Sequence, residues 1–300
     1  MQRTNPHPAL LGHLAVLVTI TIWATTYVFT KTLLDHLTPS QILVVRSLLG
    51  LAVLTLLFPK KLAYVKNIDR LFVALAGFCG IFLYYFLENT ALMHTSVTNV
   101  GVIVAAAPFT TLLASRIFLR DEKLRISYFV GLVLSMGGII ILTVSDGGDL
   151  SVSPFGDFLA LAAICVWALY TTLTRIIGRR GYPNLAVTRT MFFWGLLGHT
   201  IALVGSGQSL PIRTICTKEI LLPLLFLGLV ASAFCFALWN YGLRSIGPVK
   251  SSFYLYLSPI ITIVVATTFL GEPFTVLDGV GTALTLAGLV VSQWRFGAKK

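Results

Sequence analysis

Long apolar runs separated by short polar breaks are the main pattern of this 300-residue chain. Each run is close to the roughly 20 apolar residues that an α-helix needs to cross a bilayer. Several runs follow one another closely, and Pro, Gly and Lys residues mark the breaks between them. The span boundaries are therefore predicted only to within about four residues. The ten predicted spans are residues 11–33, 40–58, 70–90, 97–119, 126–145, 154–178, 184–205, 219–243, 249–270 and 275–295.

The predicted secondary structure is helical because of the solvent that such runs meet. Hydrocarbon offers no hydrogen-bond partners, so each crossing segment must pair its backbone groups internally, as an α-helix does. A transmembrane β-barrel would instead alternate apolar and polar residues, which these runs do not. Composition agrees, because only 11% of the residues are charged, against about 25% in soluble domains. We therefore predict an all-α membrane protein with ten transmembrane helices.

The net charge of +11 could point to nucleic acid, but the distribution of the basic residues indicates membrane topology instead. If the N-terminus is cytoplasmic, 17 of the 22 Lys and Arg residues fall in cytoplasmic segments. Lys31, Arg213 and Lys218 fall in external segments, where most of the acidic residues lie. Cytoplasmic loops of membrane proteins carry such an excess of positive charge. The protein is therefore predicted to lie in the cell membrane with both termini on the cytoplasmic side. No nucleic-acid partner is expected.

The two halves of the chain carry similar residues in the same order. The stretch IWATTYVFTK at 22–31 resembles VWALYTTLTR at 166–175, and LENTAL at 87–92 resembles LWNYGL at 238–243. Single positions correspond as well. The corresponding residues are Trp23 and Trp167, Asn89 and Asn240, Pro108 and Pro259, Glu122 and Glu272, Gly131 and Gly281, Gly138 and Gly288, and Arg46 and Arg189.

We predict two repeats, residues 1–147 and 148–300, with five spans each. Because five is odd, the second repeat enters the membrane from the opposite side, which makes the repeats inverted. Inverted repeats are common in secondary transporters, where alternating access exposes a site near the midplane to either side. A duplicated scaffold without transport is the alternative. Pro108 and Pro259 are predicted to kink their spans, and the paired glycines to allow close helix approach.

These features together resemble the drug/metabolite transporter superfamily and, within it, the EamA-type ten-helix exporters. The resemblance covers nearly the whole chain and rests on Trp23 before a Thr/Tyr-rich turn and Lys31, and on the corresponding residues and their order. It implies spans one to four and six to nine around a central cavity. It also implies export of small metabolites such as amino acids across the cytoplasmic membrane. The repeats differ where Glu88 corresponds to Trp239, and substrate-specific features are expected at such places.

Aromatic residues in the middle of spans form the first group of predicted substrate-binding residues. Trp23 and Trp167 lie mid-span, whereas a Trp that anchors a helix at the membrane interface belongs at the end of a span. Tyr27 and Tyr170 follow about one turn later in the same spans. These side chains could line a cavity or pack between helices, and the sequence leaves both interpretations open.

Glu88 is the acidic residue that lies deepest within a predicted span. A charge at that depth costs a few kcal/mol unless it is paired or hydrated. Tyr84 and Asn89 lie near it on the same helix and join the predicted substrate-binding set. Three interpretations of Glu88 are open: a proton-coupling carboxylate, a partner for a substrate amine, and a structural ion pair with Arg46.

In the second half, Trp239, Asn240 and Tyr256 are the predicted residues that could hydrogen-bond a solute. No metal site or cofactor is predicted, because the histidines lack a second ligand at helical spacing and the cysteines form no CxxC pair. The chain also lacks the phosphate-binding loop of ATP-driven pumps. A proton gradient or facilitated diffusion would then drive transport.

The leading functional prediction is a secondary transporter that exports a small metabolite, with a solute, the bilayer and, under coupling, protons as partners. One alternative is an intramembrane enzyme acting on a lipid substrate, which would require clustered acids or histidines at the membrane surface. The other is a proton-independent facilitator or channel. No catalytic residues are predicted, because the sequence contains no such cluster.

The Glu88→Gln variant tests the proton-coupling interpretation. If Glu88 carries the coupled proton, the amide cannot titrate, and transport loses its dependence on the pH gradient while downhill exchange continues. Solute flux in proteoliposomes, with and without a pH gradient, measures this. Unchanged pH dependence would remove Glu88 from the coupling mechanism.

Overall fold

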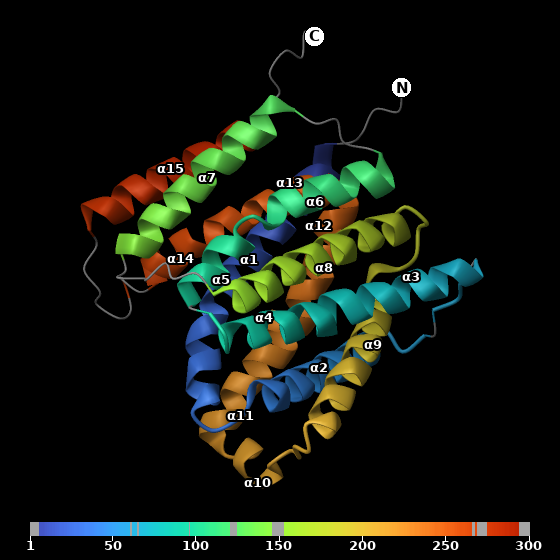
Figure 1. The fold of residues 1–300 in the computed structure, drawn as a ribbon. Coiled ribbons are helices and arrows are strands. Elements are labelled where there is room, and N and C mark those ends of the chain that lie inside the picture. Colours follow the sequence, from blue (N-terminus) through green and yellow to red (C-terminus); the bar gives the residue numbers. More distant parts are fainter. Residues whose placement is uncertain are drawn as a thin grey trace. The chain divides into compact units, whose positions relative to one another are not determined.

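The computed structural model describes residues 6–60, 62–64, 66–95, 97–120, 125–145, 153–265, 268 and 275–293. Helices joined by turns and short irregular segments make up these residues, and none of them lies in a strand (Figure 1). The all-α class is therefore confirmed. The predicted repeat boundary at 147–148 and the corresponding residues Glu122 and Glu272 lie outside the described residues.

In the first half, the third and fourth predicted spans are each built from several helical pieces. The elements are α1 (Pro6–Leu34), α2 (Pro39–Leu57), α3 (Asn67–Gly77), η1 (Phe78–Leu83), α4 (Tyr84–Leu92), α5 (Val97–Val104), α6 (Ala107–Ala114), η2 (Ser115–Leu119) and α7 (Ile126–Ser145). Of these, η1 and η2 are π-helical.

The second half contains the same succession of whole and composite helices. Its elements are α8 (Pro154–Gly178), α9 (Asn184–Gly205), α10 (Ile212–Ile215), α11 (Lys218–Leu225), η3 (Phe226–Phe234), α12 (Cys235–Ile246), α13 (Pro248–Phe253), η4 (Tyr254–Tyr256), α14 (Leu257–Val265) and α15 (Val276–Gln293). Here η3 is π-helical and η4 is a 3₁₀ turn.

Eight helices among the described residues are long and apolar enough to cross a membrane. The segment Val276–Ser292 is a shorter apolar helix. Each predicted span overlaps a helical stretch, and the ninth coincides with α13, η4 and α14. The multi-span helical architecture is thus confirmed, while the count of ten spans stays a prediction.

The beginning of α2 illustrates how local sequence sets a helix boundary. Thr38 accepts a hydrogen bond at its hydroxyl from the Gln41 backbone N–H, and the Gln41 side chain accepts one from the Thr38 N–H at 2.9 Å. This reciprocal capping box satisfies two amides that have no intrahelical partner. Pro39 occupies the first helical position, where its missing N–H costs nothing.

At Pro108, where the sequence predicts a kink, the structure shows an interruption of the helix. The chain ends α5 at Val104, turns at Ala105 and Ala106, and begins α6 at Ala107. Val104 is the residue whose carbonyl would have accepted the N–H that proline lacks. The turn therefore moves Pro108 into the first turn of a new helix. In the second half, η4 interrupts the ninth span just before Pro259, whose side chain lies outside the described residues.

The π-helical segments η1 and η3 occupy the composite third helix of each half. A π turn shifts the hydrogen-bond ladder from i→i−4 to i→i−5, which frees a carbonyl for an outside donor. Both segments have such a donor. Nε2 of His199 lies 2.7 Å from the Ile81 carbonyl in η1, and the indole Nε1 of Trp23 donates to the Ala231 carbonyl in η3 at 2.8 Å.

The chain divides into two compact units. Unit 1 comprises Met1–Phe86 and Leu169–Gly247, and unit 2 comprises Leu87–Ala168 and Pro248–Lys300. Each unit therefore draws on both predicted repeats, and the divisions fall within α4 and α8. In unit 1, α1 packs against α12, and α2 packs against α9 and η3.

Glycines set the closest approaches within unit 2, where α7 and α15 lie side by side (Figure 1). A Cβ atom added to Gly131 would lie 2.6 Å from the Gly288 carbonyl oxygen, and one on Gly138 would lie 2.6 Å from that of Gly281. The Ser135 hydroxyl also donates to the Thr285 carbonyl at 3.2 Å. The prediction that these glycines allow close helix packing is confirmed.

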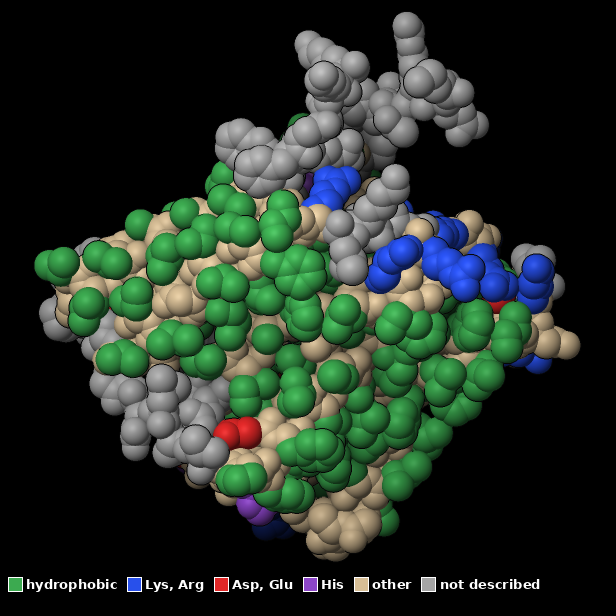
Figure 2. Space-filling model, turned by 45° about the horizontal axis from the view of Figure 1, so that its top comes forward, with side chains coloured by type: hydrophobic (Ala, Val, Ile, Leu, Met, Phe, Trp, Pro, Cys, Tyr) green, Lys and Arg blue, Asp and Glu red, His purple; other side chains and the backbone are tan. Residues whose placement is uncertain are grey.

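Large apolar side chains remain exposed on both units, including Leu56 at 81% and Val133 at 71%. Figure 2 shows that hydrophobic side chains cover most of the face in view. In water such a surface would drive aggregation, whereas lipid tails solvate it without cost. The exposed apolar surface is therefore that of a protein surrounded by lipid.

Replacing Gly138 with Ala tests the packing of α7 on α15. The added methyl group would overlap backbone atoms of α15, so we expect the free energy of unfolding to fall by about 1–3 kcal/mol. Gly137→Ala is the matched control, because its Cβ would meet only Leu284 at an ordinary 3.5 Å. Thermal unfolding in detergent measures both variants. Equal melting temperatures would contradict the packing interpretation.

Candidate functional site

The predicted substrate-binding residues are distributed over both units. Unit 1 contains the described side chains of Trp23, Tyr84, Tyr170, Trp239 and Asn240. Unit 2 contains those of Glu88, Asn89, Trp167 and Tyr256. Tyr27 belongs to α1, but its side chain lies outside the described residues.

Trp23 is held against the second half of the chain within unit 1. Its Nε1 donates to Ala231, and its ring centroid lies 5.3 Å from that of Phe236 and 5.4 Å from that of Trp239. Trp239 is fully buried, whereas Trp23 is half-buried. The indole of Trp23 therefore has a partner for its N–H and retains an exposed part.

Tyr170 and Asn240 are brought together in a buried hydrogen-bond network. The Tyr170 hydroxyl donates to Asn240 Oδ1 at 2.6 Å, and Asn240 Nδ2 donates to the Thr188 hydroxyl at 2.9 Å. All three side chains are 0–1% exposed. The network links α8, α12 and α9, so both polar ends of the Asn240 amide are occupied by the protein itself. Their predicted contact with substrate stays a prediction.

Arg46 is a buried cation that neutral groups hold in unit 1. It lies in α2 and is 9% exposed. Its Nε donates to the Ser232 hydroxyl of η3 at 3.0 Å. Its guanidinium carbon lies 5.0 Å from the centroid of the Tyr85 ring, a cation–π distance. The Tyr85 ring in turn meets Tyr84 edge to face at 5.2 Å.

The Arg46 cluster joins side chains that sequence reasoning treated separately or missed. We define it as Trp23, Arg46, Tyr84, Tyr85 and Ser232, from α1, α2, α4 and η3. Trp23 and Arg46 bond to consecutive residues, Ala231 and Ser232, of the same π-helical segment. Sequence reasoning treated Arg46 as the counterpart of Arg189 and as a partner for Glu88. The signal that pointed further was the presence of an arginine within an apolar span, which is a functional-site indication by default.

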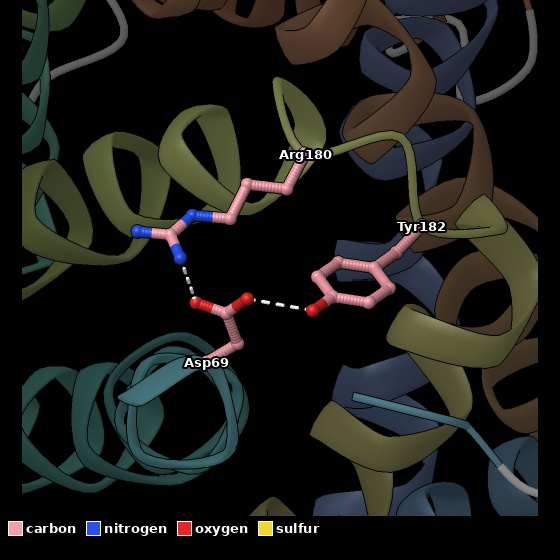
Figure 3. A network of polar contacts seen from close by, with 3 residues as sticks. All are labelled: Asp69, Arg180 and Tyr182. Atoms are coloured by element: carbon pink, nitrogen blue, oxygen red, sulfur yellow. Dashed lines mark hydrogen bonds and ion pairs between the residues drawn. The ribbon is translucent and has the colours of Figure 1, made fainter. Parts of the chain in front are cut away.

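A second charged network surrounds Asp69 at the beginning of α3 (Figure 3). The fully buried carboxylate forms an ion pair with Arg180 and accepts a hydrogen bond from the Tyr182 hydroxyl at 2.6 Å. Arg244 Nη1 donates to the Tyr182 carbonyl at 2.8 Å. The negative charge also lies at a helix N-terminus, where the backbone dipole favours it. This network fastens α3 to the turn between α8 and α9 and was not predicted.

Tyr64 extends this region of unit 1. Its ring centroid lies 6.2 Å from that of Tyr182, and the Arg70 guanidinium lies 5.4 Å from it. Burial raises the pKa of the Tyr64 hydroxyl, and the positive charge of Arg70 opposes that rise. The loop before α3 is therefore tied to the same turn as Asp69, through aromatic contact.

The predicted residues of unit 2 have different surroundings from one another. Glu88 and Asn89 are half-buried on α4, and Trp167 on α8 is 4% exposed. Tyr256 is fully buried in an apolar cluster with Phe253 and Tyr128, its ring centroid 6.0 Å from that of Phe253. Among the residues that the structure describes, no group of three His, Cys, Asp or Glu side chains could hold a metal ion.

Replacing Asp69 with Asn tests the Asp69 network. The substitution removes a buried charge partner from Arg180, which is itself partly exposed, so we expect the free energy of unfolding to fall by about 2 kcal/mol. Asp35→Asn is the control, because Asp35 is exposed in the turn after α1. Thermal unfolding of the two variants in detergent compares them. A melting temperature unchanged in both would show that the network contributes nothing to stability.

Comparison with known proteins matches both halves of the chain to the same family. The model of the EamA-like transporter family matches residues 10–144 and again residues 154–293. A solved crystal structure resembles the chain with a TM-score of 0.78 over 97% of each chain, at 20% identity. At that identity the likeness shows the fold alone.

Relatives of similar length carry transporter names. An "Uncharacterized transporter" of Archaeoglobus fulgidus is 25% identical over 285 residues, which cover 93% of this chain and 96% of the relative. The "Probable terminal-alkyne amino-acid exporter" of Streptantibioticus cattleyicolor is 27% identical over 230 residues, covering 76% and 74%. Together with the doubled family match, the apolar helices indicate a multi-pass membrane transporter. The chain belongs to the EamA-like transporter family, which is part of the drug/metabolite transporter superfamily.

Proposed function

We propose that this protein is a secondary transporter that exports small amino-acid-like metabolites across the cytoplasmic membrane. The observation that carries the proposal is the family match to both halves of the chain. A relative named as a probable terminal-alkyne amino-acid exporter supports amino acids as the solute class. Family membership also argues against the lipid-modifying enzyme, because the names of the relatives are those of transporters.

We further propose ten spans arranged as inverted repeats, residues 1–147 and 148–300, with both termini cytoplasmic. The doubled family match supports the repeat, and the excess of Lys and Arg in alternate loops supports the orientation. The corresponding positions of η1 and η3 in the two halves add support. The inverted arrangement would make inward-open and outward-open states similar in energy.

Alternating access requires places where helices can bend. The break at Ala105 and Ala106, the 3₁₀ turn η4, and the π-helical segments η1 and η3 are such places. The Arg46 cluster includes Ser232, which lies in η3, and Tyr84 and Tyr85, which follow η1 directly. A bend there would move Ser232 and Tyr85 relative to Arg46, which would couple helix motion to binding. Either a proton gradient or the gradient of the solute itself would supply the energy.

Solute exchange in proteoliposomes tests the proposed function. Vesicles loaded with unlabelled amino acids should take up the same labelled amino acid by counterflow, well above vesicles without protein, because alternating access exchanges substrate across the membrane. A panel of amino acids, with and without a pH gradient, separates coupled export from facilitated diffusion. If no solute moves under any gradient, the proposal is wrong.

A further inference from the structure

We propose that the ion pair between Asp69 and Arg180 is a releasable lock on bending of the third composite helix at η1. On release, α3 would move away from the turn between α8 and α9 as one step of alternating access. The inference rests on the proposed function and names the contact that opposes this movement. Three observations in unit 1 support it: where the pair lies along α3, how α3 and α12 are each attached, and how far water reaches the two charges.

The ion pair lies at the end of α3 that is farthest from η1. Asp69 is in the first turn of α3, whereas Gly77 ends this helix and Phe78 begins the π-helical segment. Helices bend most readily where a π turn interrupts the i→i−4 ladder. Because α3 has 11 residues, it is about 16 Å long. A small change of angle at η1 therefore displaces Asp69 substantially, and a bond at that end opposes the bend effectively.

The attachment of α3 to the turn after α8 passes through the carboxylate of Asp69. Arg180 and Tyr182 approach this carboxylate from two sides (Figure 3), one as an ion pair and the other as a hydroxyl donor at 2.6 Å. The Arg180 guanidinium carbon also lies 5.7 Å from the centroid of the Phe72 ring. In addition, α3 packs against α9. Packed helices can slide by small amounts, whereas an ion pair is either made or broken.

The corresponding helix in the second half, α12, is attached in a different way. It follows η3 directly, as α3 precedes η1. Arg175 Nη1 donates to the backbone carbonyls of Leu243 and Arg244, and Asn184 Nδ2 donates to the Ala237 carbonyl at 2.7 Å. Cationic and amide donors from α8 and α9 thus bond to the backbone of α12 at two places along its length. The side-chain ion pair of α3 is therefore the attachment that can be released.

Water reaches one partner of the ion pair and not the other. The side chain of Arg180 is 27% exposed, whereas that of Asp69 is fully buried. After release, the guanidinium can be hydrated, and the carboxylate stays in the first turn of α3, where the helix dipole favours a negative charge. A pair with one hydrated partner separates at lower cost than a fully buried pair. In the proposed topology this end of α3 is cytoplasmic, so the lock would act on the cytoplasmic side.

Two native cysteines can report bending separately in the two halves. Cys79 lies in η1 and is 5% exposed, and Cys235 begins α12 directly after η3 and is fully buried. A buried thiol reacts only when its surroundings open, so its rate of modification measures local opening. Cys165 and Cys216 are exposed and are replaced by Ser in the protein used for the assay. The reagent is methyl methanethiosulfonate in detergent, and peptide mass spectrometry gives the rate at each cysteine.

In Asp69→Asn, we expect the modification rate of Cys79 to rise by about tenfold or more, because a charge-assisted contact is lost. The rate at Cys235 should change by less than about twofold. Arg180→Gln should act in the same way, and the double variant should exceed neither single variant by more than about twofold, since both remove one contact. Asp35→Asn is the control, because Asp35 is exposed in the turn after α1, and neither rate should change.

Milder variants keep the test informative if Asp69→Asn does not fold. Arg180→Lys retains the positive charge, so it should restore most of the protection of Cys79 that Arg180→Gln loses. Tyr182→Phe removes the hydroxyl donor and keeps the ion pair, so the Cys79 rate should rise by only about threefold. Failure of Arg180→Lys to restore protection would show that the charge is not what holds α3.

Holding the lock closed tests its place in the transport cycle. The four native cysteines are replaced, and Asp69→Cys is combined with Arg180→Cys. A short bismaleimide that bridges the two positions should lower counterflow of labelled amino acids in proteoliposomes by about tenfold. The same reagent should have no such effect on either single-cysteine variant. Undiminished counterflow in the bridged protein would show that the cycle does not require release.

Two further outcomes would overturn the inference. An equal rise in the rates of Cys79 and Cys235 would mean general loosening of unit 1, and an unchanged Cys79 rate in Asp69→Asn would mean that no lock exists. The proposed function fails separately. If Cys79 responds as expected but no solute crosses the membrane in any variant, the lock on bending stands and transport does not.

Discussion

Hydrocarbon leaves a backbone amide or carbonyl no partner other than the protein itself, and this constraint bears on the departures from a straight helix at Pro108, in η1 and in η3. At Pro108 the helix ends at Val104 and a new helix begins at Ala107, so the proline lies in a first turn, where its missing N–H breaks no i→i−4 bond. In η1 and η3, ring nitrogens of His199 and Trp23 bond to the backbone carbonyls of Ile81 and Ala231. Positions where helices can bend are therefore also positions that hold side chains from other helices. The need to satisfy backbone groups in the π-helical segment η3 therefore also helps to place Trp23 in the Arg46 cluster.

The same low-dielectric surroundings treat the two buried charges of unit 1 differently. Asp69 lies at a helix N-terminus and receives both a cation and a hydroxyl donor, so its charge is satisfied within the protein. Arg46 donates to the Ser232 hydroxyl and lies over the Tyr85 ring, and these two neutral groups orient its guanidinium. A hydroxyl or an aromatic ring can fix the orientation of a guanidinium group without carrying an opposite charge. The Asp69 network is therefore a structural connection between α3 and the turn after α8.

Much of the fold follows from the sequence because it depends on local composition and on the solvent. Apolar length predicted where helices lie, and the glycines at 131, 138, 281 and 288 predicted where two of them touch closely. Proline chemistry predicted a kink in the fourth span, where the structure shows an interruption of the helix. The grouping of helices into units could not be predicted in this way. Unit 1 joins segments from both halves of the chain, and such contacts depend on the shapes of helix surfaces rather than on periodicity.

The sequence by itself determined the helical membrane class, the approximate spans, the doubled pattern and the identity of the polar residues within apolar runs. Only the tertiary structure decided which of those residues form hydrogen bonds with other residues of the protein. Tyr170 and Asn240, 70 positions apart, satisfy one another, and Trp23 finds its acceptor 208 positions away. Arg46 contacts the Ser232 hydroxyl, 186 positions away, and the Tyr85 ring, while its predicted ion pair with Glu88 stays a prediction. The physical reason is that a buried polar group is defined by its partners, and helix packing brings those partners from distant parts of the chain.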